Sequence, residues 1–337
     1  MSASASPALS RAGTTRAEPD APWLPLNLFA IPLGLAGLGG AWSAASTQLG
    51  ASPIPAEVSF AIATLIWAGF TVVYLTGGLR RIASFTADLR HPLTGPFTAY
   101  IPVVAILLIA HYAPYLGDAA VWLILAATTV LAVIAAQLVA HWLTASIERD
   151  ALHPGYFLPV VAGSFIASIG FTSVAQHEAA IAAIGIGVFF WLVIGTIVMA
   201  RLVTGAPLPP ASRPALAILV TPPGTASVAW FAATGGSVDV IQEILGGIVL
   251  FMFLVQLALL PGYLRAPFTM QYWVFTFPAA VLANDGIRWA FALQFPGWQT
   301  AGWIVLGVFT TVILAIIAAS IWKFTPRPRP HLERAGR

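Results

Sequence analysis

The sequence has no cysteine and few charged residues, and each shortage narrows the class of protein. Without cysteine, the chain has no disulfides, no thiolate metal sites and no cysteine nucleophile. Asp, Glu, Lys and Arg make up 8% of the 337 residues, whereas 59% are hydrophobic. Soluble globular domains carry roughly 25% charged residues. The composition therefore indicates an integral membrane protein and excludes a soluble one.

Sequence motifs of enzymes and of nucleic-acid-binding proteins are also missing. The chain has no glycine-rich phosphate loop of the Walker type, so we do not expect it to encode an ATP-driven pump. No two histidines have the helical spacing of metal ligands. We therefore predict a protein that is not an enzyme, needs no metal or other cofactor, and binds no nucleic acid.

Ten segments are apolar and long enough to cross a bilayer, which takes about 20 residues per helix. Residues 1–22 are small and polar and lack the apolar core of a signal peptide, so we predict a disordered cytoplasmic tail. We assign residues 23–325 to one transmembrane domain and residues 326–337 to a basic cytoplasmic tail. The predicted spans are 24–46, 54–79, 96–114, 119–145, 156–175, 178–202, 213–234, 238–260, 269–294 and 299–324.

Basic residues are unevenly distributed between the connections. The connections after the first, third, fifth, seventh and ninth spans contain no Lys or Arg. Because basic residues remain on the cytoplasmic side, both termini are predicted to lie in the cytoplasm, beneath the inner (plasma) membrane, and the number of spans is even. The basic residues on that side are Arg11, Arg16, Arg80, Arg81, Arg90, Arg149, Arg201, Arg213, Arg265, Lys323, Arg327, Arg329, Arg334 and Arg337.

Prolines divide the spans into two classes. Every odd span carries proline inside it or in its first turns, whereas even spans have proline only near their ends, as at Pro261. Broken backbone at membrane depth is tolerated only where protein covers it or where it faces a water-filled cavity. We therefore predict an all-α integral membrane fold of ten transmembrane helices in five helical hairpins, with five kinked inner (odd) helices around a central pore and five outer (even) helices. The pore-shaping prolines are Pro32, Pro102, Pro159, Pro222, Pro223 and Pro278.

The stretches FAIPLGLAGLGGAWSAAS in the first span and YWVFTFPAAVLA in the ninth, with the odd-span prolines, resemble the tellurite-resistance/dicarboxylate transporter family. That family includes the bacterial TehA proteins and the plant slow anion channels, and the resemblance covers about residues 24–324. It implies a homotrimer in which each protomer has its own pore. It also implies that the pore is closed by the phenylalanine directly before the proline of the ninth-span motif, here Phe277.

From this resemblance we predict a membrane channel or transporter for small anions of the chloride, nitrate, sulfite or C4-dicarboxylate class, gated by Phe277. Its partners are then these inorganic or organic anions and membrane lipid. A ring of acidic side chains would favour cations, and the sequences of the inner spans contain no such ring. A proton-coupled C4-dicarboxylate (malate) carrier and a tellurite or sulfite exporter stay open as alternatives. A membrane-embedded enzyme or receptor is the alternative of a different class, and it would need a polar constellation at membrane depth, of which the sequence shows none.

Few ionisable residues lie inside the predicted spans. Asp285 and Arg288 are three residues apart on one helix, and we predict a structural ion pair near the outer membrane surface, with a role in permeation as the alternative. Glu57 lies near a helix start, where the helix dipole favours a carboxylate, and His111 lies near a span end. Phe275 is expected to pack between helices and not to face the pore.

Overall fold

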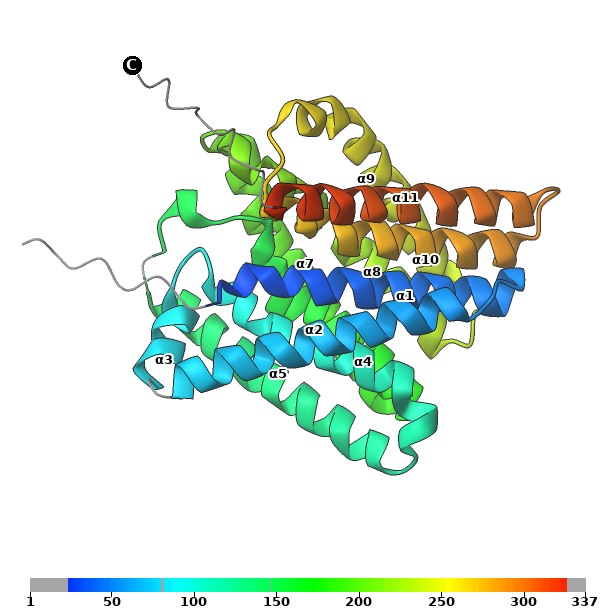
Figure 1. Cartoon of the computed structure of the whole chain (residues 1–337), viewed down its shortest axis with the longest axis horizontal. Helices are drawn as coiled ribbons and strands as arrows, with labels where there is room; N and C mark the ends of the chain where they lie inside the picture. Colours follow the sequence, from blue (N-terminus) through cyan, green and yellow to red (C-terminus); the bar gives the residue numbers. More distant parts are fainter. Residues whose placement is uncertain (1–23, 80–81, 146, 326–337) are drawn as a thin grey trace, which may run out of the picture.

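The computed structural model describes residues 24–79, 82–145 and 147–325, and within these ranges the secondary structure is entirely helical. The helices α1 (Ala30–Leu49), α2 (Ile54–Leu79), α10 (Thr276–Leu293) and α11 (Trp298–Phe324) run along the longest axis of the molecule (Figure 1). The predicted tails, residues 1–22 and 326–337, lie outside the described residues, as do Arg80 and Arg81. The all-α membrane fold predicted from the sequence is thus confirmed for the part of the chain that the structure describes.

Each even span is a single long α-helix. The helices have 26 to 28 residues, which corresponds to about 40 Å, enough to cross a bilayer. Pro261 lies within the helix of the eighth span, four residues before its last residue, Arg265, and is thus near the end of that helix as predicted. The five outer helices are α2 (Ile54–Leu79), α5 (Ala119–Thr144), α7 (His177–Thr204), α9 (Val240–Arg265) and α11 (Trp298–Phe324).

Each odd span is composite, with a 3-10 or π-helical start followed by an α-helix. The more tightly or more loosely wound start is a local departure from the α-helical hydrogen-bond pattern. The five inner spans are η1 (Leu26–Phe29) with α1 (Ala30–Leu49), η2 (Gly95–Ala99) with α4 (Tyr100–Leu116), η4 (Pro154–Tyr156) and η5 (Leu158–Ala162) with α6 (Gly163–Ser173), η6 (Pro210–Val220) with α8 (Thr221–Ala233), and η7 (Met270–Phe275) with α10 (Thr276–Leu293).

The odd-span prolines lie where the winding changes. Pro32, Pro102 and Pro278 are each in the first turn of the α-helical part of their span, and Pro159 is in the π-helical segment. A proline is tolerated in a first turn because the α-helical part itself offers no carbonyl partner for an N–H there. In the seventh span, Pro222 and Pro223 lie in the first turn of the α-helical part, after the eleven residues of η6. The prolines therefore mark a change of helix type within each inner span, where we had expected a kinked α-helix.

Burial separates the two classes of helix as predicted. In the most apolar stretch of each outer helix, 11% to 28% of the residues are buried, against 50% to 83% for the first four inner spans. Large apolar side chains remain exposed on the outer helices, including Leu65, Trp122, Leu192 and Phe251. Water-soluble proteins rarely expose apolar surface on this scale, which indicates a lipid environment.

The ninth span differs in composition from the others. Nine segments among the described residues are apolar enough to count as membrane spans, and η7 with α10 is not one of them. Asn284, Asp285 and Arg288 lower its hydropathy. However, α10 packs against α1, α8 and α11, Asp285 is buried, and Asn284 and Arg288 line a cavity inside the bundle. It therefore belongs to the inner set.

The first inner helix begins and the last outer helix ends at the same end of the bundle (Figure 1). The short helix α3 (Ile82–Arg90), which the hydropathy pattern did not predict, lies at that end too. Arg149 and Arg201, which we placed on the cytoplasmic side, follow the fourth span and end the sixth. We call this end the basic end of the bundle.

Candidate functional site

A cavity of about 350 Å³ lies among the five inner helices. Each inner helix contributes to its lining, for example through Gly37 of α1, His111 of α4, Thr172 of α6, Thr225 of α8 and Phe277 of α10. A central space bounded by the odd helices was predicted from the proline pattern, and a cavity is present there. A continuous pore through the molecule stays a prediction.

Phe277 lies at the limit of this cavity that faces the basic end. On α10 the lining begins with Phe277, in the first turn, and continues to Arg288. On α1 it runs from Ala36 to Thr47 and on α8 from Thr225 to Ala232, so the first turns of these helices do not line it. The cavity therefore occupies the half of the bundle away from the basic end.

The ring of Phe277 is held against a glycine. The side chain is 7% exposed, and a Cβ added to Gly37 would come within 2.9 Å of its Cδ2 atom. Gly37 thus provides the room that the ring occupies beside α1. Phe275, two residues earlier, packs edge-on against Tyr263 with ring centroids 4.7 Å apart and does not line the cavity, as expected.

Arg288 contributes a positive charge to the cavity. Its Nε donates a hydrogen bond of 2.7 Å to Oδ1 of Asn284, one turn earlier on α10. Among the described residues that line the cavity, none carries a carboxylate. The lining thus has a positive charge and hydroxyl groups but no fixed negative charge.

Asp285 and Arg288 do not make the direct ion pair that was predicted, although each charge still acts on the other. Asp285 is 3% exposed and accepts a hydrogen bond from Oγ of Ser227 on α8, which in turn accepts one from Nε2 of Gln242 on α9. Within the described ranges, no nitrogen of Arg288 lies within 4 Å of this carboxylate. Three residues of helix separate two side chains by about 60° around the axis. Here that angle directs Asp285 toward α8 and α9 and Arg288 into the cavity.

His111 connects the cavity to an outer helix. Its Nε2 lies 3.1 Å from Oε2 of Glu57 on α2, and its ring stacks on Phe60 with centroids 3.7 Å apart. Sequence reasoning assigned Glu57 only to a helix start and missed this pair. The partners are 54 residues apart, and no local pattern links them.

The sequence matches the family model of the SLAC1 voltage-dependent anion channels over residues 24–321. This range includes every residue that lines the inner-helix cavity. The chain belongs to the SLAC1 family. The resemblance inferred from the first and ninth spans is thereby confirmed, and the protein is a multi-pass membrane protein of an anion channel and transporter family.

Relatives come from bacteria and plants. The chain is 23% identical over 306 residues to a tellurite resistance protein TehA homolog of Haemophilus influenzae, which covers 90% of this chain and 91% of that protein. It is 21% identical to the S-type anion channel SLAH2 and 22% identical to the guard cell S-type anion channel SLAC1, both of Arabidopsis thaliana. Each match covers 88% of this chain but only 58% and 55% of the plant channels. The chain thus spans little more than half their length.

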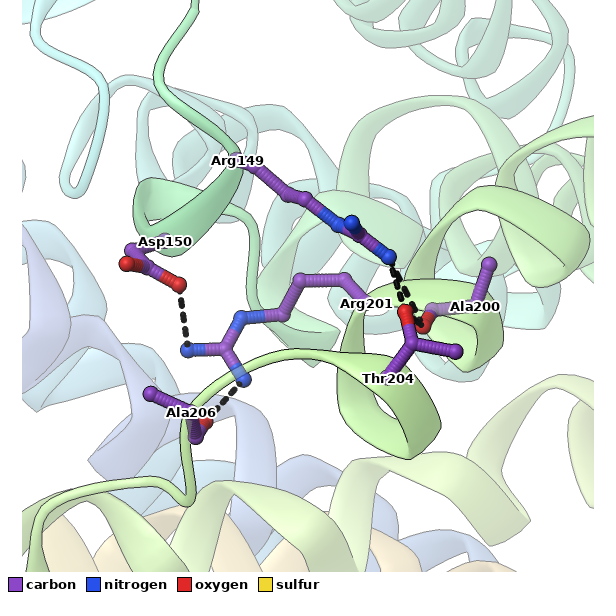
Figure 2. A network of polar contacts seen from close by, with 6 residues as sticks. All are labelled: Arg149, Asp150, Ala200, Arg201, Thr204 and Ala206. Carbon is purple, nitrogen blue, oxygen red and sulfur yellow. Dashed lines mark hydrogen bonds and ion pairs between the residues drawn. The ribbon is translucent and has the colours of Figure 1, made fainter.

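A polar network joins two connections at the basic end of this SLAC1-family protein (Figure 2). Arg201, 3% exposed in the last turn of α7, donates from Nη1 to the carbonyl oxygen of Ala206 at 2.7 Å. Its Nη2 lies 3.6 Å from Oδ1 of Asp150, in η3 (Arg149–Ala151). Nη2 of Arg149 donates a hydrogen bond to Oγ1 of Thr204. The network fixes the entry to the fifth span against the end of the sixth.

We expect Arg201→Met to lower the free energy of unfolding by about 2 kcal/mol, because the charge-assisted hydrogen bond that the buried guanidinium donates to Ala206 is lost. Asp150→Ala should cost less than about 1 kcal/mol, since the Asp150 side chain is 71% exposed and its ion pair is screened by water. Thermal unfolding in detergent measures both, with Arg265→Met, at an exposed position, as the charge control. A loss for Asp150→Ala equal to that for Arg201→Met would contradict this ranking.

His153 ties the entry of the fifth span to the connection before the third. Its Nδ1 accepts a hydrogen bond of 3.0 Å from the N–H of Gly155, so its Nε2 carries the proton that is donated to the carbonyl oxygen of Leu93, also at 3.0 Å. Burial lowers the pKa of His153, nearby Arg201 lowers it further, and the bond to Leu93 opposes this shift. The neutral ring is therefore the form that holds the two connections together.

Acid should weaken this contact. Above a pH of about 6.5, His153 is neutral in both the folded and the unfolded chain, and it adds no pH dependence. As the pH falls below that value, the unfolded chain takes up a proton that the folded chain resists, so stability falls by up to about 1.4 kcal/mol per pH unit. We expect His153→Asn to flatten the melting temperature between pH 7 and 5.5, and the exposed His177→Asn not to do so. An unchanged slope in His153→Asn would contradict this assignment.

Proposed function

We propose that this protein passes small anions along the axis of its five inner helices and that Phe277 is the gate. The observation that carries the proposal is the cavity lined by all five inner helices, which is bounded by the Phe277 ring on the side of the basic end. An aromatic ring in an otherwise open path closes it by bulk and by dewetting. The prolines at the start of the inner helices would shape the path on the other side of the gate.

The proposed cargo is a small anion of the chloride, nitrate, sulfite or C4-dicarboxylate class. Two relatives are named as S-type anion channels, and a third is named for tellurite resistance. The absence of carboxylates from the described lining supports anions over cations. A cavity of about 350 Å³ equals roughly ten water molecules in volume, enough for a partly hydrated small anion.

We further propose an oligomeric state, a membrane and an orientation for the protein. Each protomer of a homotrimer would contain its own path, in the inner (plasma) membrane, with residues 23–325 as the transport domain and both tails in the cytoplasm. The basic end would then face the cytoplasm and raise the local concentration of anions there. The exposed apolar side chains of the outer helices, such as Leu65 and Phe251, would contact lipid or the neighbouring protomers.

The test compares purified wild type with Phe277→Ala in liposomes and planar bilayers, under gradients of chloride and of malate. Anion flux that follows the electrochemical gradient and increases in the variant supports a gated path. No current in either protein, together with saturable malate uptake driven by a pH gradient, would overturn the channel and leave a carrier.

One contact supports the carrier as a second candidate. A proton-coupled carrier needs a protonatable group on its path, and His111 lines the cavity while it pairs with Glu57 at 3.1 Å. In a carrier, His111→Gln would abolish the acceleration of malate uptake by an inward proton gradient. In a channel, the same variant would leave flux independent of that gradient, as in the wild type.

A further inference from the structure

Arg288 lies where two cavities adjoin, and among the described residues no carboxylate lies within 4 Å of its nitrogens; the charge of Asp285 acts on it only from a greater distance. It lines the inner-helix cavity and also a neighbouring cavity of about 290 Å³ that Gln48, Gly235 and Gly236 help to line. Its Nε is bonded to Asn284, while its two Nη groups have no hydrogen-bond partner among the described residues. Four N–H groups of a half-buried guanidinium therefore remain available to a ligand.

The nearby carboxylates are engaged elsewhere. Asp285 accepts a hydrogen bond from the hydroxyl of Ser227, on the side of α8 and α9. Glu57 pairs with His111 on the other side of the cavity. A charge removed from water is costly unless an opposite charge or hydrogen bonds compensate for it. An anion from solution is the partner that this site lacks.

Two threonine hydroxyls in the same cavity are also without partners. Oγ1 of Thr172 on α6 and Oγ1 of Thr225 on α8 are buried and make no hydrogen bond, and Thr225 as a whole is 1% exposed. Hydroxyls in helices commonly donate to a carbonyl of the preceding turn. Thr47 and Ser173, which line the cavity too, do so. The hydroxyls of Thr172 and Thr225 thus make no competing hydrogen bond, but both oxygens are buried, and a rotation about χ1 is needed to turn them toward an anion in the cavity.

Arg288 and Thr225 lie at different distances from Phe277 along the bundle axis, on the side away from the basic end. Gly224 packs so closely on Val281 that an added Cβ would come within 2.6 Å of its Cγ1. Thr225 therefore lies beside Val281, one helical turn beyond Phe277. Arg288 is seven residues beyond Val281 on α10, a rise of about 10 Å. The charged donor is at the outer end of the cavity, and a hydroxyl donor is next to the gate.

We propose that this cavity is a built anion site in which Arg288 attracts the anion and the hydroxyls of Thr172 and Thr225 replace part of its hydration shell before it reaches Phe277. This inference rests on the proposed function and goes beyond it, because it assigns charge selectivity to named residues of this chain. The ligand class is a small anion with several acceptor lone pairs, such as a halide, nitrate or sulfite.

The experiment introduces each change into Phe277→Ala and measures the reversal potential under a tenfold KCl gradient. Arg288→Gln is expected to reduce the chloride-to-potassium permeability ratio by about tenfold, which corresponds to about 1.4 kcal/mol. Arg288→Lys should retain most of the ratio because it keeps the charge. Thr225→Val, which removes only the hydroxyl, should raise the chloride concentration at half-maximal conductance about threefold. Arg265→Gln, the same change at an exposed position of the basic end, is the matched control.

The outcomes separate this inference from the proposed function. If Phe277→Ala passes no current, the proposed function fails. If it conducts and Arg288→Gln keeps the chloride preference, the path stands and the anion site is wrong. If Arg288→Gln does not fold, the anion site can still be tested with the wild-type protein. Crystals of the wild type soaked in bromide should show anomalous scattering beside Arg288 or Thr225, and bromide bound only elsewhere overturns the site.

Discussion

Phe277→Ala is expected to raise the anion conductance of the protein in planar bilayers at least about tenfold over the wild type. The ring bounds the inner-helix cavity, and the residue that faces it across the α1 contact is Gly37, which has no side chain to fill the vacated space. Removal of the ring therefore leaves a gap and a wider, wettable path. Conductance measured with the purified protein gives the size of the effect directly.

The matched control is Phe275→Ala, which removes the same side chain two residues away. Phe275 packs on Tyr263 and Tyr272 and does not line the cavity, so this variant should remain as closed as the wild type. Phe277→Leu should conduct less than Phe277→Ala because a branched side chain still fills part of the path. Equal currents in Phe275→Ala and Phe277→Ala would show that the gate is not at Phe277.

The second large effect is expected for Gly34→Ala, which should remove most of the folded protein. A Cβ at Gly34 would lie 1.8 Å from Oγ1 and 2.5 Å from Cβ of Thr276, the first residue of α10. Thr276 is fully buried, and its hydroxyl donates to the carbonyl oxygen of Trp273 at 2.6 Å. A new rotamer cannot relieve a clash with Cβ, so α1 and α10 must separate, at a cost at or above about 3 kcal/mol.

Size-exclusion chromatography and thermal unfolding in detergent measure this loss. The matched control is Gly69→Ala on outer helix α2, where an added Cβ meets nothing within 4 Å and alanine favours the helix. The double variant Gly34→Ala with Thr276→Gly exchanges the small residue across the contact and should restore part of the folded fraction. A Gly34→Ala protein that is monodisperse and melts like the wild type would contradict the proposed close contact of α1 with α10.

Several features could be predicted from the sequence because each depends on neighbouring residues in the chain. Hydropathy over about 20 residues located the spans, and the second was predicted with the bounds Ile54–Leu79 that the structure has. The alternation of prolines predicted which helices are buried, since broken backbone needs cover at membrane depth. The motif around Pro278 indicated the family and directed attention to Phe277, which the structure places on the cavity.

Only the tertiary structure decided where the polar side chains point. Asp285 and Arg288 are close in sequence, yet α10 is rotated so that one meets Ser227 and the other faces the cavity. Glu57 and His111 are 54 residues apart, yet they pair. Helical spacing gives the angle between two side chains on one helix, but the rotation of that helix against its neighbours is set by packing with segments far away in the chain. For that reason the sequence determined the membrane fold and the family, while the unpaired Arg288 in the inner-helix cavity became visible only in three dimensions.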